Sequence, residues 1–172
     1  ADAVMLSGET AIGSHPVKAV RTMRNVASEI ETDIPTRVNL SEGDSLSEQM
    51  SAAAYTVSQQ PSIDCLIVIG EGTRQTRLLS RYRLCKPVIS VTDEPRVARQ
   101  LNLVWGSTPV RMDALPQTHI IPQIARRVYD EGLVDRDDTA VFFAGVGTDD
   151  HEEGNLVEAH RIGEFLDYHD LG

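Results

Sequence analysis

The sequence lacks the features that would assign it to several special classes of protein. Its 172 residues include two cysteines, Cys65 and Cys85, with no C-x-x-C or Cys/His spacing, so we interpret both as free structural thiols. No apolar run approaches the roughly 18 residues of a membrane span, and no export signal is recognisable. Asp and Glu outnumber Lys and Arg by 26 to 16, which argues against a nucleic-acid partner. We expect a globular cytoplasmic protein.

The first 33 residues carry two apolar patterns. Residues 3–6 form a short continuous apolar run that predicts a strand buried on both faces. Apolar residues then recur at helical spacing between Val17 and Ile30, after a proline that suits a first helical turn, and predict an amphipathic helix. The periodicity disappears over residues 32–43, so we predict one domain over residues 1–33 and a second over residues 34–172.

The second domain alternates helical and strand patterns. Ser45 and Glu48 have the spacing of a capping box, which predicts a helix that begins here and runs to about residue 59. Asp93 is expected to cap a later helix, and Gly132 to end another. We predict strands over residues 65–69, 87–92, 104–112, 139–144 and 155–162, and helices over 73–83, from 93 onward and over 120–131.

This alternation predicts an α/β fold. Strands separated by helices favour a mostly parallel sheet of about five strands with helices on both faces. The last two strand patterns have no helical pattern between them, so the final strand is expected to be antiparallel.

Three motifs resemble one known family. Residues 2–11 read DAVMLSGETA and are followed by Pro16-Val17; residues 80–83 read SRYR before KPVISVT at 86–92; residues 104–106 read VWG. In order and spacing these resemble the eighth barrel strand and helix, and then the C-terminal domain, of pyruvate kinases. The resemblance covers nearly the whole chain and is poor after Gly145.

The resemblance implies a fold, an activity and partners. It implies that the first domain is a remnant of a (β/α)8 barrel, and that the parent enzyme transfers a phosphoryl group from phosphoenolpyruvate to ADP with magnesium and potassium. The family's catalytic lysine and magnesium ligands lie on earlier barrel strands, so this chain alone is expected to be inactive and to hold no cofactor. The implied partners are the rest of the barrel and further copies of the enzyme, typically a tetramer.

Ser7 and Glu9 follow the predicted barrel strand at its carboxyl end, where such barrels gather their chemistry. In the family this turn borders the active site without supplying the proton donor or the metal ligands. The alternative is simple capping of the next helix by Thr10 or Ser14. No catalytic residue can be assigned.

The turn after the strand at 65–69 contains the candidate effector-binding residues Gly72, Thr73, Arg74, Gln75 and Arg77. Free backbone N–H groups at such a turn favour an anion, and in relatives activated by sugar bisphosphates the matching stretch binds a phosphate. Because this sequence departs from that pattern, we expect any ligand to be a singly phosphorylated sugar or nucleotide. The sequence departs from the family's hydroxyl-rich turn at Gly70 and Gln75. A tight turn also needs glycine without any ligand.

Residues 145–154 occupy the position of the family's effector loop but carry four carboxylates, which repel phosphate. A solvated acidic loop and a weak cation site are both open interpretations, and we predict no metal site. Two other functions also remain open: a stand-alone small-molecule-binding domain, and a purely structural assembly domain.

Overall fold

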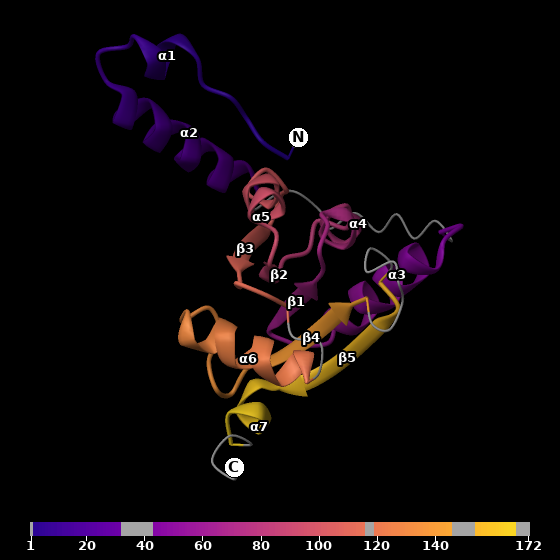
Figure 1. Ribbon diagram of the computed structural model, residues 1–172. Coiled ribbons are helices and arrows are strands. Elements are labelled where there is room, and N and C mark those ends of the chain that lie inside the picture. The colour runs from indigo at the N-terminus through magenta and orange to yellow at the C-terminus, as the bar shows by residue number, and fades with distance from the viewer. Residues whose placement is uncertain (1, 32–42, 116–118, 146–153, 168–172) are drawn as a thin grey trace. The chain divides into compact units, whose positions relative to one another are not determined.

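The computed structural model describes residues 2–31, 43–115, 119–145 and 154–167. The chain divides into two units, Ala1–Thr36 and Arg37–Gly172, and each is described by itself (Figure 1). Among the described residues no helix is both long enough and apolar enough to cross a membrane.

The first unit contains two helices, α1 (Gly8–Ala11) and α2 (Pro16–Glu31). The amphipathic helix predicted from the spacing of its apolar residues is confirmed as α2, but none of its residues is buried. The predicted strand over residues 3–6 is wrong, because this segment has no strand conformation. A strand requires a neighbour to complete its backbone hydrogen bonds, and the described residues of this unit include no second strand.

The second unit is built on a five-stranded sheet. Its strands lie in the order β3-β2-β1-β4-β5, and every neighbouring pair is parallel except β4 and β5. The predicted α/β class and the antiparallel last strand are therefore confirmed. The strands are β1 (Cys65–Ile69), β2 (Val88–Thr92), β3 (Ser107–Arg111), β4 (Thr139–Ala144) and β5 (Leu156–Arg161).

Helices cover both faces of this sheet (Figure 1). On one face, α3 (Leu46–Ser58) and α4 (Arg74–Ser80) pack on Leu66, Val68 and Phe143. On the other face, α6 (Ile120–Asp130) and α7 (Ile162–Asp167) pack on Ile67, Ile69 and Phe142. Because successive side chains of a strand point to opposite faces, the continuous apolar runs of β1 and β4 supply both cores. The short helix α5 (Pro95–Leu101) lies against β2 and β3.

The helix ends follow the predicted signals at two positions and depart from them at a third. The capping box is confirmed, since Ser45 Oγ accepts the Glu48 N–H at 3.3 Å while the Glu48 carboxylate accepts the Ser45 N–H at 3.3 Å. Gly132 ends α6 with a φ of +70°, also as predicted. The predicted cap by Asp93 is wrong: Glu94 is the N-cap of α5, and Asp93 Oδ2 accepts the Leu115 N–H at 3.0 Å. The Asp93 carboxylate thus bonds to the backbone N–H of a distant residue instead of capping the helix that follows it.

Candidate functional site

The order of the strands locates the part of the sheet where a ligand is best accommodated. The chain leaves β1 toward β2 on one side, whereas β4 lies on the other side of β1. Loops that leave the carboxyl ends of such neighbours diverge and form a crevice, which is the usual ligand site of open α/β sheets. At this edge lie the turn that begins at Gly70 and the loop that begins at Gly145. Residues 146–153 of that loop, including the predicted acidic stretch, lie outside the described residues.

Gln75 is buried at the carboxyl end of β1. Its side chain is fully buried, and it lies so close to Gly70 that a Cβ atom there would be 3.2 Å from Gln75 Oε1. A Cβ atom at Gly154 would be 3.3 Å from Gln75 Cγ. Gln75 therefore packs between the turn after β1 and the residue that leads into β5. Of the predicted effector-binding residues, it is the one that solvent cannot reach.

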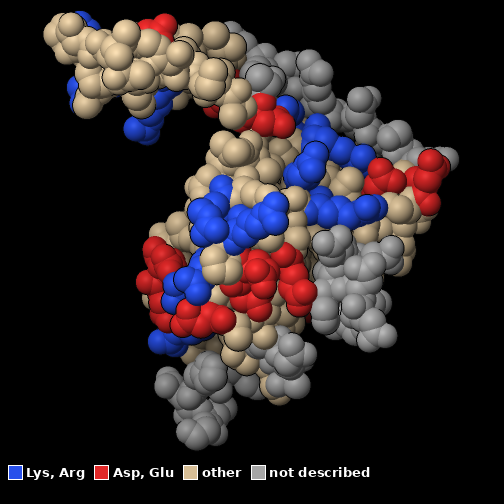
Figure 2. All heavy atoms as spheres, turned by 45° about the horizontal axis from the view of Figure 1, so that its top comes forward, with Lys and Arg blue, Asp and Glu red and all other residues tan. Residues whose placement is uncertain are grey.

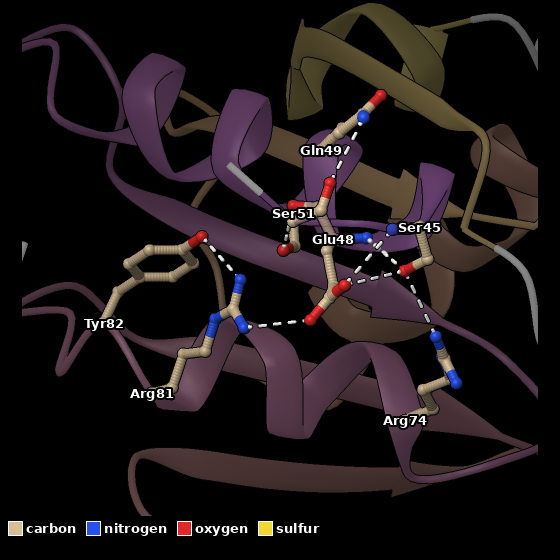
Figure 3. A network of polar contacts seen from close by, with 8 residues as sticks. Ser45, Glu48, Gln49, Ser51, Arg74, Arg81 and Tyr82 are labelled. Carbon is tan, nitrogen blue, oxygen red and sulfur yellow. Dashed lines mark hydrogen bonds and ion pairs between the residues drawn. The ribbon is translucent and has the colours of Figure 1, made fainter. Parts of the chain in front are cut away.

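Arg74 is tied to the first turn of α3 (Figure 3). Its Nη2 donates to Ser45 Oγ at 3.3 Å, so the N-cap residue of α3 contacts the first residue of α4. Arg81, one residue beyond α4, donates to Glu48 Oε1 at 3.4 Å and to the Tyr82 hydroxyl at 3.1 Å. These contacts join α3 and α4 through one polar network.

Arg77 lies in the middle of α4 and is exposed. Within the described part of the chain its guanidinium makes no hydrogen bond or ion pair. Together with Gly72, Thr73 and Arg74, it leaves positive charge and backbone N–H groups near the carboxyl end of β1. The helix itself has seven residues, and its N-cap Thr73 makes no side-chain capping bond. The anion-binding capacity of this turn therefore depends on its arginines more than on the helix end.

The buried side of α4 carries hydroxyl groups that the sequence analysis did not single out. Thr76 Oγ1 is 2.9 Å from Ser90 Oγ in β2, and Ser90 Oγ is 3.0 Å from Ser107 Oγ at the start of β3. Ser80 Oγ donates to the Trp105 carbonyl oxygen at 2.8 Å. The spacing of Thr76 and Ser80, four residues apart, places both hydroxyls on one helix face, but it does not identify their partners in β2 and before β3.

Ser7 and Glu9 lie in the first unit at the start of α1. The Glu9 carboxylate accepts the Ser7 N–H at 3.1 Å, and Thr10 Oγ1 donates to the Ser7 carbonyl oxygen at 3.1 Å. Hydrogen bonds from the backbone N–H of Glu9 and then of Ser7 hold the pKa of the Glu9 carboxyl below its ordinary value. These contacts stabilise the local turn.

The charges of the molecule are unevenly distributed despite the net charge of −10. Figure 2 shows a band of Lys and Arg side chains across the viewed face, with a group of Asp and Glu side chains directly beside it. Such a band attracts an anion locally even in an acidic protein. Within the described ranges, no group of three or more His, Cys, Asp or Glu side chains could hold a metal ion.

Comparison with known proteins identifies the family. The family model described as "Pyruvate kinase, alpha/beta domain" matches residues 48–160, which include the whole five-stranded sheet except the last residue of β5. This chain belongs to the pyruvate kinase alpha/beta domain family. The pyruvate kinase of Staphylococcus epidermidis is 32% identical over 171 residues, and that of Staphylococcus aureus is 31% identical over the same length. Each alignment covers 96% of this chain and 29% of the relative.

Solved pyruvate kinase structures have the same fold. Two structures of the Cryptosporidium parvum pyruvate kinase match with TM-scores of 0.79 and 0.77 at 28% and 27% identity. Each match covers 92% of this chain and 32% of the solved chain. The chain therefore corresponds to the C-terminal alpha/beta region of pyruvate kinases and spans about 30% of the length of the relatives it matches.

Proposed function

We propose that this chain is the C-terminal regulatory and assembly part of a cytoplasmic pyruvate kinase, whose complete form transfers a phosphoryl group from phosphoenolpyruvate to ADP. The family membership supports this proposal, and so does the resemblance of residues 2–11 to the last barrel strand and its turn. Magnesium and potassium would serve the complete enzyme. The resemblance places the family's magnesium ligands on earlier barrel strands, so no step of the chemistry is assigned to the residues of this chain.

The regulatory role we propose is the binding of a phosphorylated sugar or nucleotide at the turn after β1. The observation that carries it is the position of Gly72, Thr73 and Arg74 in the turn after β1, at the point of the sheet where β4 lies beside β1, with Arg77 one helical turn further along α4. A guanidinium group recognises a phosphate through two parallel N–H donors, and Arg77 has its donors available among the described residues. Buried Gln75 would support the turn without touching the ligand.

A thermal-shift experiment tests this role on the purified chain with AMP, glucose 6-phosphate, ribose 5-phosphate and fructose 1,6-bisphosphate. A ligand at 100 times its dissociation constant stabilises by about 2.7 kcal/mol, which corresponds to about 5 to 10 °C for a domain of this size. We expect a shift with one of the monophosphates and a loss of that shift in Arg77→Ala. Arg126→Ala is the matched control, because Arg126 lies on α6 at the other face of the sheet and pairs with Asp130. A flat response to all four compounds would contradict the regulatory role.

The assembly role we propose uses the outer edge of β5. The opposite edge, at β3, is closed to a further strand, because Pro109 has no N–H to donate and the Arg111 carbonyl oxygen accepts a bond from Arg127 Nη2 at 3.3 Å. At β5 the described residues supply no strand beyond β4. A second copy of the domain could therefore pair with this edge and form a homo-oligomer.

Ala159 provides a specific test of this edge. It faces Val141 across the β4–β5 ladder, and Ile162 N–H donates to the Asp138 carbonyl oxygen three positions along. Since hydrogen-bonded and non-bonded pairs alternate in an antiparallel ladder, the Ala159 N–H points away from β4. We expect Ala159→Pro to shift sedimentation toward the monomer while the fold is kept, and Ala159→Ser to sediment as the unsubstituted chain does. Equal sedimentation of both variants would refute the use of this edge.

The exposed face of α2 supports a third contact, with the rest of the barrel. Val17, Val20, Val26 and Ile30 are between 48% and 71% exposed, an unusual area of apolar surface for one helix. We propose that this face packs against neighbouring barrel elements in the complete enzyme. The amide hydrogens of α2 should then exchange more slowly in a complete chain than in this one.

A further inference from the structure

The helix that carries the candidate effector arginines is held to the sheet in an unusual way. Four residues of α4 are buried, Gln75, Thr76, Leu79 and Ser80, and Leu79 alone among them is apolar. Apolar contacts are not directional, so Leu79 does little to set the rotation of this two-turn helix about its axis. The contacts of Arg74 and Arg81 with α3 restrain its exposed side, and the buried polar side chains are left to set its orientation against the sheet.

The hydroxyl groups beneath α4 supply that interaction. Thr76 and Ser90 are 2% and 1% exposed, and their Oγ atoms are 2.9 Å apart; Ser90 in turn lies 3.0 Å from Ser107. Ser80 donates to the Trp105 carbonyl oxygen one turn later. Hydrogen bonds depend on angle as well as distance, so these contacts define one orientation of the helix against β2 and β3.

The arginines lie on the opposite, exposed side of the same helix. Arg77 follows Thr76 directly, and Arg74 is one turn earlier than Arg77, where Ser45 of α3 holds it. A helix turns by about 100° per residue, so a rotation that breaks the Thr76–Ser90 contact also swings the Arg77 guanidinium sideways. The arginine has no other partner among the described residues to hold it.

We propose that the hydroxyl chain Thr76–Ser90–Ser107, buried at Thr76 and Ser90, fixes the rotation of α4 and thereby orients Arg77 toward a phosphate group of the effector. Thr76, Ser90 and Ser107 are positioning residues, because they act through the helix and do not touch the ligand. This inference rests on the proposed effector binding. The simpler alternative is that the three hydroxyls only satisfy one another's hydrogen-bonding capacity, in which case their loss changes stability and nothing else.

Thr76→Val separates the two interpretations, because valine keeps the shape of threonine and removes the hydroxyl. Thr76→Ser restores the hydroxyl, and Ser90→Ala breaks the same chain from the strand side. The matched control is Thr56→Val on α3, where an exposed threonine bonds to the carbonyl of its own helix. Isothermal titration with AMP, glucose 6-phosphate and ribose 5-phosphate gives the affinity. Amide hydrogen exchange of α4 gives its mobility without any ligand.

We expect Thr76→Val and Ser90→Ala to weaken binding of the responsive probe by about fivefold, as the loss of one neutral hydrogen bond implies, with Thr76→Ser and Thr56→Val close to the unsubstituted chain. The α4 amides should exchange faster in the first two variants alone. Unchanged α4 exchange in Thr76→Val overturns the positioning role, whether or not any probe binds. Faster exchange with unchanged affinity overturns the link to Arg77. If the unsubstituted chain binds no probe, the proposed effector function and the orientation of Arg77 toward an effector both fall, and exchange alone decides whether the hydroxyl chain holds α4.

Discussion

Gly154 is expected to be the least replaceable glycine at the candidate site, and Gly154→Ala tests the packing between β4 and the entry to β5. A Cβ atom at this position would lie 2.4 Å from Phe143 Cζ and 2.5 Å from Phe143 Cε2. Carbon atoms in contact are about 3.5 to 4.0 Å apart, so ring and backbone must separate by about 1 Å. Phe143 is fully buried against α3, which leaves the ring little room to retreat.

Forced overpacking of this kind typically costs about 1 to 3 kcal/mol of unfolding free energy. Urea denaturation followed by circular dichroism would measure it as a lower midpoint with an unchanged slope. In a Phe143→Leu background the smaller side chain leaves space, so the same glycine substitution should cost at least about 0.5 kcal/mol less. Gly106→Ala is the control: it has open space but a φ of +74°, so its cost of about 1 kcal/mol should be the same in both backgrounds. A Gly154→Ala cost that is equally large in the Phe143→Leu background would refute the steric argument.

Three further predictions concern the cap of α3, the thiols and catalysis. Hydrogen bonds from the Ser45 hydroxyl and then its backbone N–H lower the pKa of the Glu48 carboxyl from its ordinary 4.5, so the stability it contributes is present above that pH and is lost as the pH falls through the lower folded-state value. Denaturation should therefore find Glu48→Gln destabilised at pH 7 and equal to the unsubstituted chain in strong acid. Burial, and then Asp138 and Asp64, raise the pKa of the Cys65 thiol to about 12, so Ellman's reagent at pH 8 should label exposed Cys85 and spare Cys65 until the protein unfolds. A coupled assay should detect no pyruvate formation from this chain alone, and measurable turnover would contradict the assignment of the chemistry to the missing barrel.

The second unit was predictable because its strands and helices follow simple periodic rules. β1 and β4 are continuous apolar runs that a sheet covered on both faces requires, and the structure places helices on both faces. The capping box at Ser45 depends on residues within one turn, so it could be predicted from spacing alone. Sequence spacing therefore predicted the structure correctly where the contacts that determine it lie within a few residues of one another.

The wrong or missing predictions concern segments whose structure depends on distant residues or that are too short to show a period. The run at residues 3–6 has the composition of a strand, but strand formation depends on partners that composition cannot reveal. Aspartate is a residue type that often caps helices, yet the Asp93 carboxylate accepts a hydrogen bond from the backbone N–H of Leu115, a residue far along the chain. The short helices α1 and α7 were not predicted, because four and six residues are too few to display a helical period. In each case a tertiary contact or a missing period decided the outcome.

The candidate site shows the same division. The glycine turn and its arginines were predicted from a strand pattern followed by a helical one, whereas the burial of Gln75 and the hydroxyls beneath α4 depend on β2, β3 and the residue before β5. Polar residues are normally interpreted as exposed, so a buried hydroxyl chain leaves no trace in a hydrophobic pattern. Thr76 and Ser90 could be paired only once the strands had been placed.

The two proposed roles share one structural connection. β4 ends at Ala144 beside β1, and the described chain returns to the sheet at Gly154, which leads into β5, the edge proposed for association. Gln75, beneath the effector turn, packs against that same return point. If both roles hold, a ligand that stabilises one arrangement of this return stabilises the matching arrangement of the β5 edge. Thermodynamic reciprocity then requires that association strengthen ligand binding by the same factor by which ligand strengthens association. If Ala159→Pro abolishes association and leaves the ligand affinity unchanged, the return at Gly154 does not couple ligand binding to association.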